Sequence, residues 1–249
     1  MVRPVALISG VSRTASIGAA VARKLATGGW DLALTYWAPC DERMPWGAHP
    51  EDLENLKVEL LSTGSRVVFI ASDLEQSHSA SGLFGKVTAE LGPVSALVLS
   101  HCESVGSSIM DTTLESFERH FAVNVRASWQ LIQQLAVQTP ESGGRIVALT
   151  SDDTVGNLPY GASKGALDRI VLAAARELAH LNITSNAVNP GPIDTGWMDD
   201  QTRISLTQRQ PTGRLGTAAD AANLIAFLLS PEGSWINGQL IKSDGGISA

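Results

Sequence analysis

The sequence predicts an α/β fold in which residues 1–249 form a single domain around one doubly wound parallel sheet of about seven strands, with helices on both faces. Short β-branched or aliphatic segments alternate with longer segments of helical period, which is typical of right-handed βαβ units. The short segments are nearly all apolar, as strands covered on both faces should be. No internal repeat or low-complexity linker divides the chain.

The elements can be placed in order along the chain. The expected strands span residues 4–9, 31–37, 66–71, 95–100, 145–151, 183–188 and 238–242. Helical periodicity predicts helices near residues 17–27, 50–62, 77–91, 113–138, 159–180 and 217–230. Glycines just beyond the first three helices are stop signals. The irregular stretch 38–49, "APCDERMPWGAH", is expected to be a loop.

Composition excludes several function classes. The formal net charge of -7 argues against a broad surface for nucleic acid or anionic membranes. Cys40 and Cys102 form no Cys-x-x-Cys pair, and the five histidines show no metal-ligand spacing, so neither a disulfide framework nor a metal site is expected. The amino-terminal apolar run is too short for a signal peptide or a membrane span of ~20 residues. We therefore expect a cytoplasmic protein.

A glycine-containing turn, "GVSRTASIG", joins the first expected strand to the first helix. Glycines let the backbone approach a pyrophosphate, and a helix amino terminus offers free N–H groups to it. The turn therefore predicts a dinucleotide site; an ordinary βα turn with glycines at strained positions is the alternative. Its candidate cofactor-binding residues are Gly10, Ser12, Arg13, Ser16, Ile17 and Gly18.

The end of the second strand bears on the choice of cofactor. NAD-binding folds usually place an acid there for the ribose hydroxyls, but "LTYWAPC" has none before Asp41. Arg13 in the glycine turn could hold a 2'-phosphate through two hydrogen bonds. The sequence therefore favours NADP(H) over NAD(H). A solvated loop arginine is the alternative for Arg13.

Tyr160 and Lys164 carry the clearest chemical signal. Pro159 starts a predicted helix, so the two side chains lie one above the other at positions i and i+4. Lowering the pKa of a tyrosine by ~3 units requires ~4 kcal/mol of differential interaction, which an ammonium and a positive nicotinamide could supply. The alternative is an ordinary surface pair on a helix. Ser151 lies nine positions before Tyr160 and completes a candidate catalytic set.

The chain resembles the short-chain dehydrogenase/reductase family over essentially its whole length, and in particular its 3-oxoacyl-acyl-carrier-protein reductase-like members. The resemblance depends on the glycine turn, Asp73 in "ASDLE", Asn124 in "FAVNV", Ser151 in "RIVALTS", "YGASK" at 160–164, "NPGPIDT" at 189–195 and the closing "GQLIKSDGG". It implies a Rossmann-type fold and a reductase or dehydrogenase acting on a small carbonyl or alcohol substrate.

The resemblance also implies individual roles. Tyr160 would be the general acid or base, Lys164 would bind the nicotinamide ribose and lower the tyrosine pKa, and Ser151 would orient the substrate oxygen. Asn124 would hold a water that links Lys164 to solvent, a role compatible with an asparagine satisfying a helix kink. The remaining implied cofactor contacts are Asp73, Leu74, Ser100, Pro190, Gly191, Ile193 and Thr195. The helices near 113–138 and 159–180 would pair with a second copy, giving a homodimer or homotetramer.

Three departures from the family pattern stand out. Ser16 replaces the middle glycine of the turn, and "LSHC" at 99–102 replaces an Asn-Asn-Ala-Gly motif, which makes Cys102 either a buried inert thiol or a reactive one. The interval between Ser151 and Tyr160 is shorter than usual. We still favour Ser151 over Thr150, because alternation along the strand points Thr150 to the opposite face.

The shortened loop between Ser151 and Tyr160 should shape the substrate pocket. Asp152 or Asp153 could approach a polar or cationic substrate group; alternatively both are solvated or favour the following helix terminus. The other pocket candidates are Val105, Trp197 and Met198, in loops or a short mobile helix.

Two functions remain open at this stage: an NADP(H)-dependent carbonyl reductase or alcohol dehydrogenase, and a non-catalytic NADP(H)-binding redox sensor. The complete Ser151, Tyr160 and Lys164 set favours the enzyme, because a sensor has no need of a tuned tyrosine.

Overall fold

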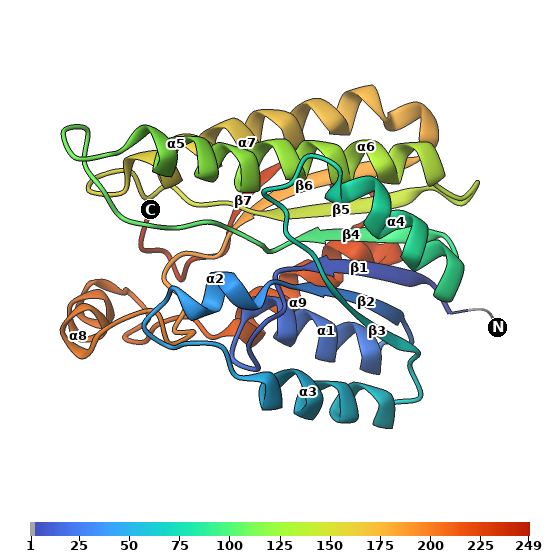
Figure 1. Ribbon diagram of the computed structural model, residues 1–249, viewed down its shortest axis with the longest axis horizontal. Helices are drawn as coiled ribbons and strands as arrows, with labels where there is room; N and C mark the ends of the chain where they lie inside the picture. Colours follow the sequence, from blue (N-terminus) through green and yellow to red (C-terminus); the bar gives the residue numbers. More distant parts are fainter. Residues whose placement is uncertain (1–2) are drawn as a thin grey trace.

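A computed structural model describes residues 3–249, which form a seven-stranded sheet with strand order β3-β2-β1-β4-β5-β6-β7 (Figure 1). All neighbouring strands are parallel. Strand order reverses direction between β1 and β4, so a crevice is expected at the carboxyl ends of these strands. The predicted fold is therefore confirmed. The strands are β1 (Val5–Ser9), β2 (Asp31–Tyr36), β3 (Val67–Ala71), β4 (Val94–Leu99), β5 (Gly144–Leu149), β6 (Ile183–Asn189) and β7 (Leu240–Lys242).

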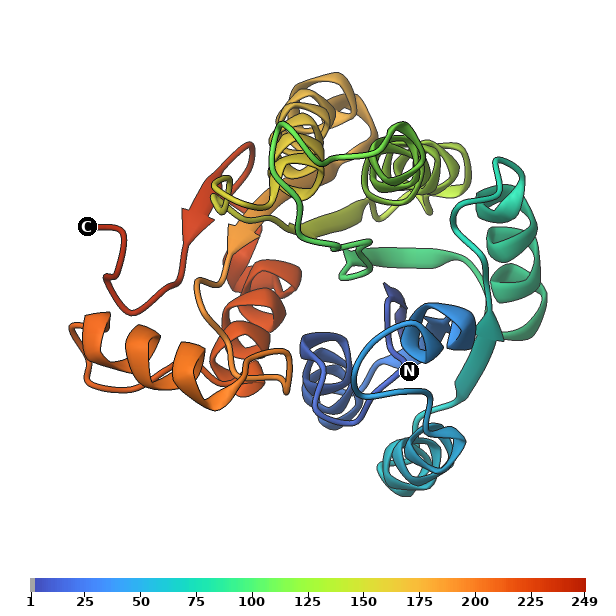
Figure 2. The same ribbon diagram turned by 60° about the vertical axis from the view of Figure 1, so that its left-hand side comes forward.

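Helices cover both faces of this sheet (Figures 1 and 2). One face carries α4 (Ser79–Glu90), α6 (Ser128–Gln138) and α7 (Leu158–Glu177), and the other carries α1 (Ile17–Thr27), α3 (Pro50–Ser62) and α9 (Ala218–Leu229). Alternate residues of β1 enter the two cores: Leu7 packs on the first side and Ile8 on the second. This two-sided burial explains why the strands are apolar throughout rather than alternating.

The sequence analysis predicted a loop over residues 38–49. This prediction is wrong for the first part of the stretch, which forms the short helix α2 (Ala38–Glu42). Pro39 lies in the first turn of this helix. Proline is tolerated there because the amide hydrogens of the first turn have no partner inside the helix.

The predicted helix over 113–138 is divided into three parts. α5 (Leu114–His120) passes into a π-helical turn, η1 (Phe121–Ala127), and then into α6. Asn124 lies in this turn. π-Helical turns depend on local packing, so the apolar period alone did not reveal this one.

The carboxyl-terminal part of the chain adds three further elements. The predicted helix 159–180 ends as α7 followed by the 3₁₀ turn η2 (Ala179–Leu181), and another 3₁₀ turn, η3 (Pro231–Gly233), follows α9. α8 (Asp200–Arg209) lies beyond the loop that carries Trp197 and Met198. Within residues 3–249, no helix is both long and apolar enough to cross a membrane.

Candidate active site

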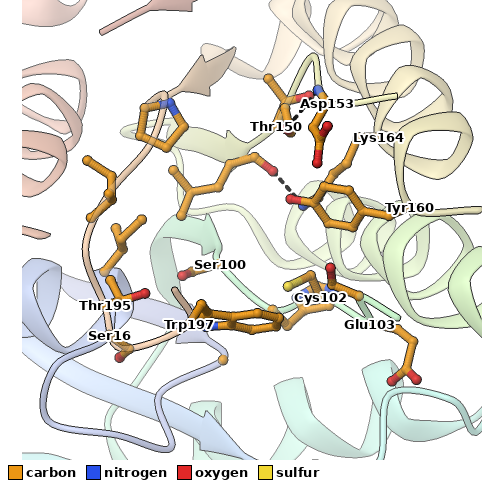
Figure 3. Close-up of a pocket in the computed structure, with 18 of the residues that line it drawn as sticks. Ser16, Ser100, Cys102, Glu103, Thr150, Asp153, Tyr160, Lys164, Thr195 and Trp197 are labelled. Carbon is orange, nitrogen blue, oxygen red and sulfur yellow. Dashed lines mark hydrogen bonds between the residues drawn. The ribbon is translucent and has the colours of Figure 1, made fainter. Parts of the chain in front are cut away.

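A cavity of about 810 Å³ opens at the carboxyl edge of the sheet and gathers most of the predicted site residues (Figure 3). Gly18 and Asn124 are buried behind its wall, and Val105 is also outside it, whereas Trp197 and Met198 line it. The predicted residues in the wall are Gly10, Ser12, Arg13, Ser16, Ile17, Asp73, Leu74, Ser100, Ser151, Tyr160, Lys164, Pro190, Gly191, Ile193 and Thr195.

The glycine turn is shaped by the residues that follow β4. Gly10 has φ +75°, and a Cβ there would lie 2.6 Å from the His101 Cα atom, so only glycine fits. Ser16, in the place of the family's middle glycine, is the N-cap of α1, where its Oγ accepts a hydrogen bond from the Ala19 amide at 3.1 Å. The serine therefore stabilises the helix terminus that faces the cavity.

Arg13 bridges two walls of the cavity and is not a solvated loop arginine. Its Nη1 donates to the Thr195 carbonyl oxygen at 2.8 Å. Its guanidinium carbon lies 4.3 Å from the ring centroid of Trp46 and 6.0 Å from that of Trp197. The two indole rings are themselves 4.5 Å apart. Together these contacts join the glycine turn, the chain after α2 and the loop after β6.

The 38–49 stretch contributes a second contact across the cavity. The sequence analysis predicted neither this contact nor that of Arg13 with Trp46. Arg43 makes a paired contact with Glu103: Nη1 donates to Oε1 at 3.2 Å and Nη2 to Oε2 at 3.0 Å. Glu103 is only 3 % exposed, so loss of Arg43 would leave a buried carboxylate without its charged partner. The sequence offered one indication of these contacts: Arg43 and Trp46 follow shortly after β2, whose carboxyl end faces the cavity.

His101 forms the floor of the cavity between β1 and β4. Its Nδ1 lies 2.6 Å from the Ser9 Oγ, and its Nε2 lies 3.0 Å from the Val123 carbonyl oxygen. Burial, assisted by the charge of Lys164, lowers the pKa of His101 to about 4. The imidazole is therefore neutral at pH 7, with its Nε2–H donated to the carbonyl and its Nδ1 accepting from the serine.

Tyr160 and Lys164 are brought together on the first two turns of α7 (Figure 3). The Lys164 Nζ lies 5.6 Å from the centroid of the Tyr160 ring. Lys164 is 2 % exposed, and its Nζ donates to the Leu149 carbonyl oxygen at 2.8 Å, which ties α7 to the end of β5. Burial lowers the pKa of Lys164, and Cys102 and Asp168 oppose that effect.

The tyrosine pKa differs from the sequence-based expectation. Burial raises the pKa of Tyr160, the Asp153 carboxylate raises it slightly further, and the hydrogen bond to the Ser151 hydroxyl lowers it. The sequence suggested a lowered value because the spacing to Lys164 was visible and the burial was not. A phenol with a raised pKa is protonated near pH 7, as a proton donor must be, but it is a weaker acid, so proton transfer still needs a group that stabilises the phenolate.

Ser151 and Thr150 differ in their surroundings. Thr150 is buried and its amide donates to the Val188 carbonyl oxygen, which continues the pairing of β5 with β6. Ser151 is half-buried at the cavity wall and its Oγ accepts from the Asp153 amide at 3.1 Å. The serine thus remains the better candidate to touch a substrate.

Asn124 positions the start of α7 from behind. Its Oδ1 accepts from the Glu103 amide at 2.7 Å, and its Nδ2 donates to the Glu103 carbonyl oxygen and to the Ser163 Oγ. Ser163 in turn donates to the Tyr160 carbonyl oxygen at 2.7 Å. The predicted role of Asn124 in holding a water stays a prediction.

The remaining polar candidates have partners of their own. Asp73 accepts from the Glu75 amide at 3.0 Å, which fixes the turn that borders the cavity. Burial raises the pKa of Cys102 and raises that of Cys40 to about 11, so both thiols are protonated and poorly nucleophilic. This supports the inert interpretation of Cys102.

The cavity fits a dinucleotide. It is long enough to run from the glycine turn past the end of β2 to Lys164, and it places the amino terminus of α1 on its wall. Gly191, with φ +64°, lies so close to Asp244 that a Cβ would meet the aspartate Cβ at 2.5 Å. The chain after β6 can therefore border the cavity through bare backbone.

Comparison with known proteins agrees with this geometry. The sequence profile of the family described as "Enoyl-(Acyl carrier protein) reductase" matches residues 10–248. An uncharacterised oxidoreductase, YjdA, of Bacillus subtilis is 38% identical over 97% of this chain and 96% of its own length. An NADPH-dependent aldehyde reductase-like chloroplast protein of Arabidopsis thaliana is 31% identical over 97% of this chain and 93% of its own.

A solved structure also superimposes closely. A short-chain dehydrogenase of Burkholderia cenocepacia, crystallised in complex with NADP, has a TM-score of 0.88 and 31% sequence identity. The similarity covers 100% of this chain and 99% of that one. The two proteins are therefore similar in amino-acid sequence as well as in fold.

Gly161→Ala should destabilise the protein by about 1 to 3 kcal/mol, because the new Cβ would lie 2.5 Å from the Asp153 carbonyl oxygen. Gly165→Ala on the same helix is the matched control, since its Cβ would meet nothing within 4 Å. That control should gain about 0.5 to 1 kcal/mol from the better helix propensity. Urea unfolding measures both; equal effects would contradict the close packing of loop 152–157 on α7.

Stability should fall as the pH drops from 6.5 towards 4, because His101 has a lower pKa in the folded protein than in the unfolded chain. Between these pH values the unfolded chain binds more protons than the folded protein, so acid favours unfolding. The contribution of neutral His101 to the free energy of unfolding is therefore complete only above pH 6.5. Its size is on the order of 3 kcal/mol. Chemical unfolding from pH 7 to 4.5 should show a smaller loss in His101→Asn, and an unchanged pH dependence would contradict the assignment.

Proposed function

Because this chain belongs to the short-chain dehydrogenase/reductase family, we propose that it is an NADPH-dependent oxidoreductase that reduces a ketone to a secondary alcohol or catalyses the reverse reaction. The observation that carries this proposal is the pairing of Tyr160 with the buried Lys164 on one face of α7, beside Ser151 in a cavity that fits a dinucleotide. A protein with no chemistry to perform has no reason to bury an ammonium group beside a tyrosine.

Ser151, Tyr160 and Lys164 have different roles in the proposed carbonyl reduction. A bound nicotinamide supplies the hydride. Ser151 donates a hydrogen bond to the carbonyl oxygen and fixes its position, and Tyr160 transfers its hydroxyl proton to that oxygen as charge develops. Lys164, held by the Leu149 carbonyl, favours the phenolate left behind and can bind ribose hydroxyls through its other hydrogens. In the oxidative direction the phenolate accepts the proton, so that direction should accelerate as pH rises.

The preference for NADPH is supported by charge near the end of β2. Arg13 and Arg43 both line the cavity there. Asp41, the first acid after β2, is buried, and its Oδ1 accepts from the Trp46 Nε1 at 3.0 Å, so one of its two carboxylate oxygens is already engaged within the protein. The Arg13 guanidinium, which forms no ion pair within residues 3–249, suits a 2'-phosphate, whereas Arg43 is paired with Glu103.

The alternative is a redox sensor that binds NADP(H) without turnover. The catalytic set disfavours it, because sensing needs only the cofactor contacts. A sensor would tolerate loss of the Tyr160 hydroxyl, whereas an enzyme would not.

The remaining properties follow from the family and the surface. We infer a single catalytic domain in the cytoplasm that takes small-molecule substrates rather than nucleic acid or membranes, and that assembles as a homodimer or homotetramer. Support for assembly comes from apolar side chains exposed on α5 and α6: Leu114, Phe117, Trp129 and Val137.

Tyr160→Phe should reduce turnover by about 10² or more while leaving the affinity for NADPH within about twofold. Only the proton-donating hydroxyl is lost, and the ring still packs on α7. NADPH oxidation followed at saturating carbonyl compound measures turnover, and NADPH fluorescence titration measures binding. Undiminished turnover would defeat the mechanism and favour the sensor.

The native protein should show kcat/KM with NADPH at least about tenfold above that with NADH in a screen of ketones and aldehydes. Arg13→Gln should raise KM for NADPH about tenfold and that for NADH much less, because one charge facing the phosphate is removed. Arg169→Gln, an exposed arginine outside the cavity, is the control. Equal or faster turnover with NADH would overturn the cofactor assignment.

A further inference from the structure

Asp153 is a charged group beside the reaction centre that the proposed chemistry does not use. It lines the cavity from the short loop that follows β5, two residues after Ser151. Figure 3 shows its side chain extending from the loop toward Tyr160 and Lys164. A carboxylate in this place affects any substrate that reaches Tyr160.

The position of Asp153 is fixed by three contacts. Its amide donates to the Ser151 Oγ at 3.1 Å, and its Oδ2 accepts from the Asn157 Nδ2 at 3.1 Å. Its carbonyl oxygen rests against the first turn of α7 so closely that only glycine is tolerated at position 161. The carboxylate is therefore preorganised, and it would lose little conformational entropy on binding a ligand.

Within the part of the chain that the structure describes, the charge of Asp153 has no counterion. Its neighbour Asp152 lies 3.1 Å from the Lys242 Nζ in an ion pair. Across residues 3–249, no lysine, arginine or histidine forms such a pair with Asp153, whose single side-chain donor is the neutral amide of Asn157. The two aspartates that the sequence left equivalent are thus distinct.

An unpaired carboxylate here works against catalysis by Tyr160. It raises the pKa of the tyrosine and so disfavours the phenolate that forms when the proton leaves. A positive charge bound against Asp153 would offset this repulsion and would add its own attraction, which is that of a solvent-screened pair because Asp153 is exposed. The carboxylate is a disadvantage for neutral or anionic substrates only.

The geometry points to Asp153 as the group that binds a cationic substituent of the substrate, so that the substrate is a ketone or secondary alcohol carrying an ammonium group near the reacting carbon. This inference rests on the proposed oxidoreductase function. In the oxidative direction the carbinol carbon gives a hydride to NADP⁺ and the hydroxyl proton passes to Tyr160, while the ammonium group stays on Asp153 unchanged.

One basic side chain offers a competing preference. Arg209, at the carboxyl end of α8, also lines the cavity and is exposed. A substrate carboxylate would favour this arginine and be repelled by Asp153. Arg209 has no interaction with Tyr160 comparable to that of Asp153, so the ammonium substrate is the one that relieves the site of repulsion.

Three secondary alcohols of similar size test the inference: 4-amino-2-butanol, 2-pentanol and 3-hydroxybutyrate, which are cationic, neutral and anionic at pH 8. With NADP⁺ the native enzyme should oxidise the amino alcohol with kcat/KM at least about tenfold above that for 2-pentanol, and 3-hydroxybutyrate should be slowest. A difference below threefold between the first two, or a preference for the anion, would overturn the inference.

Variants at the two aspartates separate charge from structure. Asp153→Asn should lower kcat/KM for the amino alcohol about tenfold while that for 2-pentanol does not fall, and Asp153→Glu should keep the native order of preference. Asp152→Asn is the matched control, because its charge is paired with Lys242. An unchanged ratio of amine to neutral alcohol in Asp153→Asn would contradict the assignment.

Titration calorimetry of 4-amino-2-butanol and of 2-pentanol into the NADP⁺-loaded protein distinguishes the two possible failures. Amine binding that weakens about tenfold in Asp153→Asn supports the cation site even if no alcohol is oxidised, in which event the proposed oxidoreductase function fails alone. Oxidation without discrimination, or amine binding that is insensitive to Asp153→Asn, leaves the oxidoreductase standing and overturns the cation site.

Discussion

The hydrogen bond from Lys164 to the Leu149 carbonyl is the contact on which the site depends. It joins the end of β5 to the second turn of α7, and thereby fixes Tyr160 relative to Ser151. Burying an ammonium group is costly unless its hydrogens have partners, and the carbonyl provides one. Two further hydrogen bonds hold the start of α7 from the opposite side. Asn124 donates to the Ser163 Oγ, and Ser163 donates to the Tyr160 carbonyl oxygen.

Loop 152–157 can be short because its two ends are set by these rigid elements. Its brevity presses Asp153 and Thr154 against Gly161, where a side chain would clash. The same closeness places a carboxylate beside the reacting hydroxyl, where it adds a small increase to a Tyr160 pKa that burial already raises. A feature that looked like a small deletion in the sequence thus changes the electrostatics of the site.

Two cross-cavity contacts relate the proposed cofactor site to the chain after β2. Arg13 connects the glycine turn with Thr195 and with Trp46, and Arg43 connects α2 with Glu103. Arg13 places positive charge along the cavity, which agrees with the preference for a phosphorylated cofactor proposed above, whereas the charge of Arg43 is offset by Glu103. The loop after β6 is therefore held by the glycine turn as well as by its own packing.

The sequence by itself determined the order of strands and helices, because a strand buried on both faces must be apolar throughout and a covering helix must repeat its apolar residues every three to four positions. It also determined the juxtaposition of Tyr160 and Lys164, since a spacing of four residues on one helix fixes a common face. The end of β5 and the start of α7 likewise placed Ser151 at the same edge of the sheet.

Only the tertiary structure decided how these groups are charged and paired. The partner of Arg13 lies 182 residues away, the counterion of Asp152 is Lys242 on β7, and Asn124 in the π-helical turn bonds to Glu103 and Ser163 from other elements. The direction of the Tyr160 pKa shift follows from burial, which no local pattern records. Contacts within one turn of a helix are fixed by covalent spacing, whereas desolvation and ion pairing are properties of the packed molecule.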